Sequence, residues 1–322
     1  MCARKRFTSN AFSGRARNPQ YKEPRKQGSA RFCNAQSTVT TRRDYLRLTA
    51  LAAAAGCTLR LPAKDAHAPA LFYGVQIAGV REQAERDLAQ LLHDLRQIGF
   101  TEVESHAIVY HHSAATLRQM VEDAGLSAPA GHFSLPDIEG QLDYARDLGL
   151  KYVVAMLRPR PQTLEEYRLV ADRLNDAGRK AGSHGMTFAL LFHNHELLPQ
   201  HGSSGFAELM KHTDPALVAL EVDIYWIVQA GLDPAAFLRQ HQDRVKLLHL
   251  KDRLPGFPTS YTTDADSDHS TELGKGTIAW PALLRQAGSQ GIHHAFLDYD
   301  QSSVPILDSL KESVTYLKTL QD

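Results

Sequence analysis

Cysteine is almost absent from this 322-residue chain. The three cysteines are Cys2, Cys33 and Cys57, so residues 58–322 can form no internal disulfide and offer no thiolate for catalysis or metal binding. A body without cysteine suits an oxidising compartment. Long apolar runs are also absent, because none reaches the roughly 18–20 residues that a bilayer-spanning helix needs. With 43% hydrophobic and 22% charged residues, the composition indicates a soluble globular protein.

Net charge is absent too, because 36 Lys and Arg residues balance 36 Asp and Glu residues. The balance hides an asymmetry: residues 1–47 carry a net charge of +10, so residues 48–322 carry −10. An acidic body lacks the basic surface with which proteins bind nucleic acids, and this excludes that class of partner. Histidine is concentrated in the body, where all 16 histidines lie at or beyond His67.

The first 70 residues have the composition of a leader. Residues 1–40 are basic and poor in apolar residues, which is typical of a disordered segment, and their length favours a true start at Val39. Residues 41–56, TRRDYLRLTALAAAAG, place twin arginines before a short apolar stretch, so residues 41–70 resemble a twin-arginine export signal and linker. The alternative is a basic leader with a chance Arg-Arg pair. We expect export to the periplasm without lipid anchoring at Cys57.

From residue 71 onward, short apolar runs alternate with longer amphipathic runs. The short runs predict strands at 71–77, 101–105, 128–134, 151–157, 186–194, 219–225, 245–252 and 293–300. Between them, apolar residues spaced three or four apart predict helices. Eight strand–helix units in about 250 residues predict a single (β/α)8 TIM barrel over residues 71–322. A doubly wound sheet is the alternative, but the glycine-rich nucleotide-binding motif typical of such sheets does not follow the first strand.

Polar side chains mark the ends of seven of the eight predicted strands. In a (β/α)8 barrel the carboxyl ends of the strands meet at one face, where catalysis takes place. Carboxylates and imidazoles without cysteine suit a divalent ion such as Mn, Co, Zn or Mg. We therefore predict a divalent metal site among these ends, which carry Gln76, Glu104, His132, His193-Asn194-His195-Glu196, Asp223, His249-Leu250-Lys251-Asp252, Asp298 and Asp300.

Several longer stretches of the body form a recognisable set. They are GVQIAGVRE near the first strand, HFS at the third, FHNHE at the fifth, residues 221–252, and ELGKGTIAW before the last helix. Together, over about residues 72–318, they resemble the sugar phosphate isomerase/epimerase family of xylose-isomerase-like barrels. The resemblance implies one divalent metal ion bound by Glu, Asp, His and Glu on the fifth to eighth strands. It places Asp223, His249 and Asp298 as ligands.

The fifth strand departs from the family pattern. Leu191 stands where the glutamate ligand is expected. Either His195, or less readily His193, replaces it as a ligand, or Asp223, His249 and Asp298 hold the metal more loosely and the FHNHE stretch contacts the substrate. Two-base epimerisation loses support, because Asp298 is also shorter than the usual glutamate. Proton abstraction next to a metal-polarised carbonyl needs one base, one metal and a proton donor, which leaves isomerisation, dehydration or β-elimination. We assign His193, Glu196, Lys251 and His132 as catalytic candidates, and Gln76, Glu104, Tyr225, Trp226 and Asp300 as substrate contacts.

The expected substrate is a small unphosphorylated sugar, keto-sugar or glycoside. The only glycine-lysine candidate for a phosphate site, GKG at 274–276, falls on a loop, and export argues against a phosphorylated substrate. One alternative is an exported sugar-binding protein that kept the barrel and lost catalysis. Another, a metal-dependent phosphodiesterase, needs more ligands and a basic surface. A homo-oligomer stays open, and no membrane contact is expected beyond export.

Overall fold

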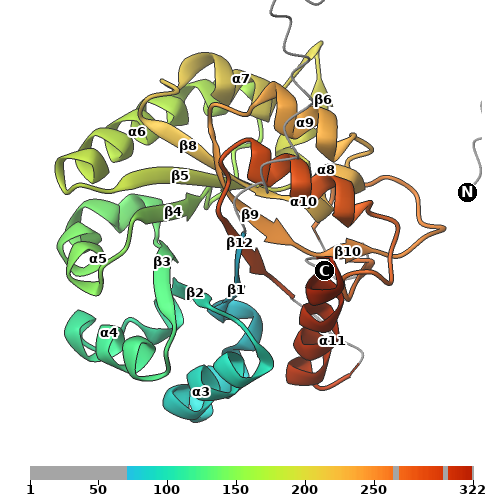
Figure 1. The fold of residues 1–322 in the computed structure, drawn as a ribbon. Coiled ribbons are helices and arrows are strands. Elements are labelled where there is room, and N and C mark those ends of the chain that lie inside the picture. Colours follow the sequence, from blue (N-terminus) through green and yellow to red (C-terminus); the bar gives the residue numbers. More distant parts are fainter. Residues whose placement is uncertain (1–70, 264–267, 300–303, 321–322) are drawn as a thin grey trace, which may run out of the picture. The chain divides into compact units, whose positions relative to one another are not determined.

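The structure is a computed structural model that describes residues 71–263, 268–299 and 304–320. Eight parallel strands close into a barrel with helices on its outside (Figure 1). Their order around the barrel is β1-β2-β3-β4-β5-β8-β9-β12, and β12 pairs with β1. The predicted (β/α)8 TIM barrel is confirmed. The strands are β1 (Phe72–Gln76), β2 (Glu102–His106), β3 (Ser127–His132), β4 (Tyr152–Met156), β5 (Thr187–Phe192), β8 (Val218–Asp223), β9 (Val245–Leu250) and β12 (His294–Leu297).

The helices between the strands bury the apolar faces that the sequence periodicity predicts. The four leucines of α3 are buried, and Gly99 ends this helix in the left-handed conformation that glycine adopts without strain. Asp87 interrupts the predicted first helix, because its extended backbone ends α2 while its side chain caps α3. The α-helices outside the barrel are α2 (Arg81–Arg86), α3 (Leu88–Ile98), α4 (Ala114–Asp123), α5 (Leu142–Leu148), α6 (Leu164–Ser183), α7 (Gly205–His212), α9 (Pro234–Gln240), α10 (Trp280–Ser289) and α11 (Ile306–Thr319).

Seven of the eight strands end one to three residues earlier than predicted, and two of these changes affect the candidate site. β5 ends at Phe192, and the next residues form a 3-10 turn, η4 (Asn194–Leu197). β8 ends at Asp223 and is followed at once by a short helix, α8 (Ile224–Gln229). The side chains beyond Phe192 and Asp223 therefore do not continue the strand alternation on which the predictions relied.

Two small hairpins decorate the loops. One consists of β6 (Pro199–Gln200) and β7 (Ser203–Ser204), between η4 and α7. The other consists of β10 (Asp252–Arg253) and β11 (Ser270–Thr271), between β9 and α10. Asp252 organises this second region, because its carboxylate accepts the backbone N–H groups of Arg253, Gly274, Gly276 and Ile278.

The interior of the barrel has an apolar layer and a polar layer. The apolar layer packs side chains from six strands, and the polar layer follows toward the carboxyl ends of the strands. Parallel pairing sets Leu191 beside Glu221 and Asp223 beside His249. The core of the barrel therefore supports the polar residues from below. The apolar layer consists of Ala130, Val154, Ala189, Leu191, Ala219, Leu247 and Phe296.

The predictions for residues 1–70, a basic leader followed by a twin-arginine signal, lie outside the described residues, as does the predicted substrate contact Asp300. Among the residues that the structure does describe, no helix has both the length and the apolar character needed to cross a membrane.

Candidate active site

His249 stands between two groups of polar side chains at the carboxyl end of the barrel. It is fully buried on β9. Its Nδ1 lies 3.4 Å from Asp298 Oδ2, and Asp223, His249 and Asp298 each offer a ligand atom within 4.8 Å of the others. Its Nε2 lies 2.7 Å from Glu104 Oε2 and 3.4 Å from Glu221 Oε1. One imidazole ring thus belongs to both groups.

The first group, Asp223, His249 and Asp298, brings together the three ligands predicted on the last three strands. Asp223 is held in place because its Oδ1 accepts the backbone N–H groups of Tyr225 at 2.8 Å and Trp226 at 3.4 Å, as the N-cap of α8. Nδ1 of His249 is buried and makes no hydrogen bond. Buried polar atoms normally have a partner. A buried imidazole nitrogen that makes no hydrogen bond and lies beside two carboxylates fits a divalent metal ion.

Burial raises the pKa of Asp223 to about 7, although Lys251 and His249 act in the opposite direction. Burial also opposes ionisation of Asp298, but Lys251 and His249 hold the pKa of Asp298 below its usual range. A buried carboxylate and a partly exposed one lie close to the same imidazole, and a divalent cation would compensate their negative charge.

His193, rather than His195, lies on the metal side of the turn after β5. The pairing of β5 with β8 ends at Phe192 and Val222, one residue before His193 and Asp223. His193 and Asp298 line the same cavity. Burial, together with the neighbouring His195 and Lys251, lowers the pKa of His193 to about 3. A neutral imidazole therefore faces the cavity.

His195 and Glu196 shape the turn and lie outside the cavity lining. His195 Nε2 is 2.6 Å from Glu196 Oε1, and Glu196 Oε2 accepts the backbone N–H of His193 at 2.9 Å. Glu196 is buried and forms a capping box with His193 at the start of η4. His193, His195 and Glu196 also offer ligand atoms within 4.8 Å of one another, so the assignments of His195 to the metal and of Glu196 to catalysis stay predictions. Strand alternation does not fix the direction of either side chain, because β5 ends before them.

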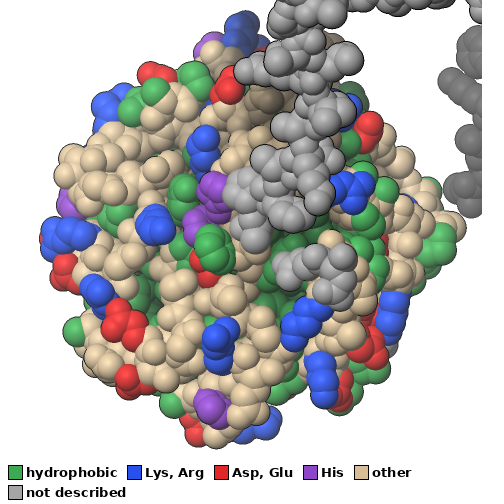
Figure 2. Space-filling view, viewed as in Figure 1, with side chains coloured by type: hydrophobic (Ala, Val, Ile, Leu, Met, Phe, Trp, Pro, Cys, Tyr) green, Lys and Arg blue, Asp and Glu red, His purple; other side chains and the backbone are tan. Residues whose placement is uncertain are grey.

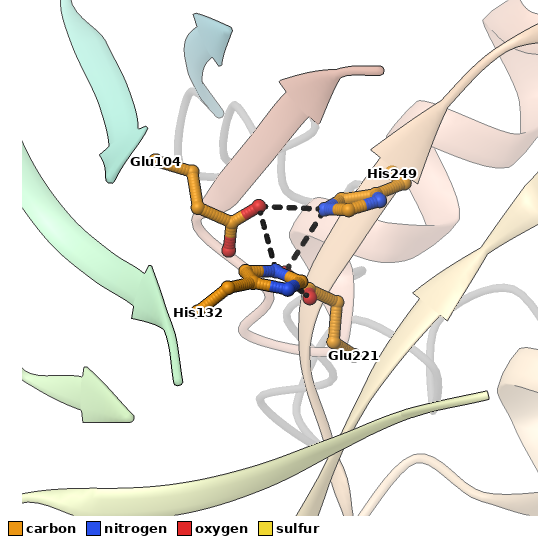
Figure 3. Close-up of side chains that lie close together, drawn as sticks. All are labelled: Glu104, His132, Glu221 and His249. Carbon is orange, nitrogen blue, oxygen red and sulfur yellow. Dashed lines mark hydrogen bonds and ion pairs between the residues drawn. The ribbon is translucent and has the colours of Figure 1, made fainter. Parts of the chain in front are cut away.

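The second group, the buried tetrad, consists of Glu104 on β2, His132 on β3, Glu221 on β8 and His249 on β9 (Figure 3). His132 Nε2 lies 3.1 Å from Glu104 Oε2 and 3.0 Å from Glu221 Oε2. Burial alone would lower the pKa of His132, but Glu104 and Glu221 raise it to about 10. Burial raises the pKa of Glu104, and the charge of Glu221 raises it further.

The tetrad gives one predicted residue, Glu104, a buried setting and adds one residue, Glu221, that was not predicted. Glu104, predicted as a substrate contact, is fully buried and paired with two imidazoles, so it lies behind the site. Glu221 was not predicted at all. The signal was present, since Glu221 stands two residues before Asp223 and therefore on the same face of the strand. A glutamate inside an otherwise apolar strand needs a partner.

Lys251 carries a buried positive charge next to the metal ligands. It is fully buried, and its Nζ lies 4.0 Å from Asp298 Oδ2. The same Nζ stands 5.6 Å from the ring centroid of Tyr225 and 5.5 Å from that of Trp226. Both rings are buried in α8 and lie around Lys251. Their assignment as substrate contacts stays a prediction.

A cavity of about 530 Å³ opens at the carboxyl end of the barrel. Of the predicted residues, Gln76, His132, His193 and Asp298 line it. His106, which was not predicted, lines it as well, because it follows Glu104 by two residues on β2. Figure 2 shows histidine side chains gathered near the middle of the face drawn. Three imidazoles and one carboxylate therefore share the cavity lining with two arginines, Arg81 and Arg158, and with apolar side chains such as Leu135, Met156 and Leu191.

The chain is a (β/α)8 barrel protein with a candidate metal-binding site, because carboxylates and imidazoles gather at the carboxyl ends of its strands. A profile of the xylose isomerase-like TIM barrel family matches residues 71–320, and the chain belongs to this family.

Curated relatives match part of the chain. An inosose dehydratase of Clostridium beijerinckii is 38% identical over 88 residues, which are 27% of this chain and 29% of that protein. An inosose dehydratase of Bacillus anthracis is 34% identical over 90 residues, which are 28% of this chain and 30% of that protein. The chain thus spans less than a third of the length of these relatives.

Solved structures share the fold over most of the barrel. A sugar phosphate isomerase/epimerase from Parabacteroides distasonis superposes with a TM-score of 0.67 at 22% identity, covering 76% of this chain and 97% of that one. The IOLI protein, solved with a zinc atom, gives 0.62 at 18% identity, covering 78% and 98%. A 3-keto-D-glucoside 4-epimerase from E. coli gives 0.56 at 17% identity, covering 77% and 99%. At these identities the likeness establishes the fold.

Proposed function

We propose that this protein is a metal-dependent lyase or isomerase that removes a proton next to the carbonyl group of an unphosphorylated sugar or keto-sugar. The observation that carries the proposal is the convergence of Asp223, His249 and Asp298 around a buried Nδ1 that makes no hydrogen bond. The cavity of about 530 Å³, which Asp298 lines, has room for a monosaccharide. The names of the relatives, inosose dehydratases and a keto-glucoside epimerase, support the same substrate class.

Asp223, His249 and Asp298 would hold the divalent ion, with His193 on the same side of the cavity. When bound, such an ion supplies Lewis-acid polarisation of a substrate oxygen. The donor set of two carboxylates and one or two imidazoles suits Mn, Co, Zn or Mg and does not select among them.

The side chains around the cavity divide into a proton acceptor and a proton donor. His193, with a pKa of about 3, presents a neutral imidazole that can accept a proton. His132, with a pKa of about 10, stays protonated near neutral pH and lines the same cavity. The two pKa shifts leave a neutral imidazole at His193 and a charged one at His132, and burial makes His193 a weaker base than free imidazole. In a dehydration, the carbon-bound proton passes to the base, and the leaving hydroxyl takes a proton from the acid.

Lys251 complements this pair by holding a positive charge beside Asp298. Negative charge that develops on a substrate oxygen during proton removal is stabilised by a fixed cation in a site with little water. Gln76 adds a polar contact at the edge of the cavity, although its Oε1 already accepts the backbone N–H of Ala78 at 2.6 Å.

A solvent-deuterium exchange screen tests the proposal without knowledge of the product. The protein is stripped with a chelator, reloaded with Mn or Co, and incubated in deuterated water with inososes, 3-keto-glycosides and a phosphorylated sugar. We expect deuterium at carbon only with the reloaded protein and an unphosphorylated keto-sugar. Metal binding without exchange on any of these substrates would contradict the proposal.

The same screen addresses the second candidate function, an exported sugar-binding protein without catalysis. Leu191 favours this alternative, because it occupies the position where the family resemblance expects a glutamate ligand. Calorimetric binding of a sugar, together with no exchange in the presence of metal, is the result that this alternative predicts.

Export remains part of the proposal. The twin arginines at 42–43 support a twin-arginine route, and an unphosphorylated substrate fits a periplasmic location. Fractionation of cells that produce the full chain tests this point. Substitution of both arginines by lysine should keep the protein in the cytoplasm.

A further inference from the structure

We propose that Glu104 and Glu221, which the general acid His132 bridges, are positioning residues that present Nδ1 of His249 to the metal ion. This inference rests on the proposed metal centre and names the part of the protein that sets it up. The three residues come from β2, β3 and β8, and their side chains converge on the ring of His249 (Figure 3).

The ring of His249 has two distinct ends, and each end meets a different group. Nε2 lies 2.7 Å from Glu104 Oε2, a hydrogen-bond distance in which the carboxylate accepts and Nε2–H donates. Nδ1 lies on the side of Asp298 and has no hydrogen-bond partner. The hydrogen bond at one ring nitrogen fixes which tautomer is present. With the proton held at Nε2, the lone pair of Nδ1 is the one offered to a metal.

Glu104 is itself held by the rest of the tetrad. Its Oε2 also lies 3.1 Å from His132 Nε2, and that nitrogen lies 3.0 Å from Glu221 Oε2. Glu104, Glu221 and His249 are fully buried, and His132 is 4% exposed. The carboxylate that meets Nε2 therefore cannot swing toward solvent. Partners of this kind fix the ring orientation of metal-binding histidines and raise their affinity for the metal.

The tetrad lowers the stability of the barrel relative to apolar packing at the same place. Oε1 of Glu104 and Oε1 of Glu221 are buried and have no hydrogen-bond partner. A buried charged network that is only partly satisfied is worse for stability than apolar packing. The neighbouring layer shows that this barrel packs apolar side chains readily. The network lowers stability and contacts a proposed metal ligand. A role in the metal site explains its presence.

The same strand supplies a matched control. Glu102 precedes Glu104 by two residues on β2, is 4% exposed, and lies with its Oε2 2.8 Å from Nδ1 of His294. The two carboxylate–imidazole pairs thus share a strand, a face and a degree of burial. Only the pair at Glu104 includes a proposed metal ligand.

The experiment compares Glu104→Leu with Glu102→Leu in the full chain, using Co²⁺ alone as the probe. Binding is measured by calorimetry, and the ligand geometry is followed by the visible absorption of bound Co²⁺. We expect Glu104→Leu to weaken Co²⁺ binding by about 10–100-fold and to alter the absorption spectrum. We expect Glu102→Leu to keep both unchanged. Glu104→Gln keeps an oxygen acceptor for Nε2–H and should recover most of the affinity.

Each outcome has a distinct meaning. Equal affinity and equal spectra for wild type and Glu104→Leu would overturn the positioning role. Two Co²⁺ ions per wild-type chain, with one lost in Glu104→Leu, would also overturn it and make the tetrad a metal site of its own. No Co²⁺ binding by the wild type would refute the proposed function itself. If Glu104→Leu fails to fold, Glu104→Asp, which draws the carboxylate back by one methylene, carries the same comparison.

Discussion

Asp223 and Asp233 cap two successive helices in the same way, yet only Asp223 belongs to the candidate metal centre. Oδ1 of Asp223 accepts the backbone N–H of Tyr225 at 2.8 Å, and Oδ1 of Asp233 accepts that of Ala235 at 2.9 Å. The two residues therefore share the capping role and differ in the second role.

Replacement of each aspartate by asparagine separates the two roles. Asn keeps the size and the capping oxygen but removes the charge. Asp223→Asn should weaken Mn²⁺ or Co²⁺ binding by more than the roughly 10–100-fold that loss of an outer partner costs. Asp233→Asn should leave metal affinity unchanged. Calorimetric titration of both variants checks the expectation, and equal affinities would remove Asp223 from the ligand set.

Lys251 should matter for turnover and not for metal uptake. Lys251→Met keeps the length of the side chain between Tyr225 and Trp226 and removes the cation beside Asp298. We expect the rate of deuterium exchange to fall by about 10²-fold, the usual cost of losing one stabilising group for a developing negative charge. Metal affinity should not fall.

Lys246 on the same strand is the control for Lys251. Strand alternation directs Lys246 out of the barrel, so Lys246→Met should leave the exchange rate unchanged. A loss of metal binding in Lys251→Met, with or without loss of exchange, would instead show that this cation supports the metal centre.

His241 should make the barrel less stable in mild acid. Burial lowers the pKa of His241 in the folded protein, and the nearby Arg244 lowers it further. The unfolded chain has the ordinary pKa of about 6.5, so it takes up the proton at a higher pH than the folded chain. Stability is therefore lost as the pH falls below about 6.5, and the loss ends below the folded pKa.

Urea unfolding of wild type and His241→Gln, measured near pH 7.5 and pH 5.5, tests this sign. The variant loses the packing of the ring against Phe206 and Phe237 at both pH values, so only the difference between them counts. Between pH 7.5 and pH 5.5 we expect the free energy of unfolding to fall less in His241→Gln than in wild type. The difference should be below about 1 kcal/mol, because solvent screens a partly exposed ring. His93→Gln, on an exposed helix face, should behave as wild type.

Asn194, in the middle of the FHNHE stretch, should control the loop that follows β10. Its Nδ2 donates to the carbonyl oxygens of Ser260 and Thr262, each at 2.8 Å. Asn194→Ala removes both bonds, worth about 1 kcal/mol each, and should speed amide hydrogen exchange in residues 255–263.

Asn175 provides the comparison for Asn194. Its Nδ2 donates to the carbonyl oxygen of His212 at 3.1 Å, and its Oδ1 accepts the N–H of Asp214 at 2.7 Å. Asn175→Ala should therefore speed exchange around residues 212–214 and leave residues 255–263 as in wild type. Unchanged exchange of residues 255–263 in Asn194→Ala would mean that other contacts hold the loop.

The fold could be predicted from the sequence because buried parallel strands read as short apolar runs. The alternation of these runs with helical faces fixed the number of units. α8 was missed because IYWIVQ is rich in β-branched and aromatic residues, and tertiary context overrides such preferences. The capping bonds of Asp223 start a helix there, and they cannot be read from composition.

The direction of a site residue could be predicted where the residue lies at a strand end. It could not be predicted where the residue lies beyond the strand. Asp223, His249 and Asp298 follow from the resemblance and from the register of the last three strands. His193 and His195 could not be told apart, since the direction of a side chain in a 3-10 turn depends on bonds such as that of Glu196 to the backbone. Glu104 and Glu221 meet His249 across the barrel, a contact that no local pattern contains.

The tetrad also has a consequence for the cooperativity of folding. Its members are separated by 145 residues between Glu104 and His249 and by 89 residues between His132 and Glu221. A chain that has built β1 to β4 alone holds Glu104 and His132 without the strands that complete their bonds, and an incompletely paired buried charge is costly. The first half of the barrel is therefore less stable when it folds without the second half. The same four side chains that prepare one ligand nitrogen also join the two halves into one unfolding unit.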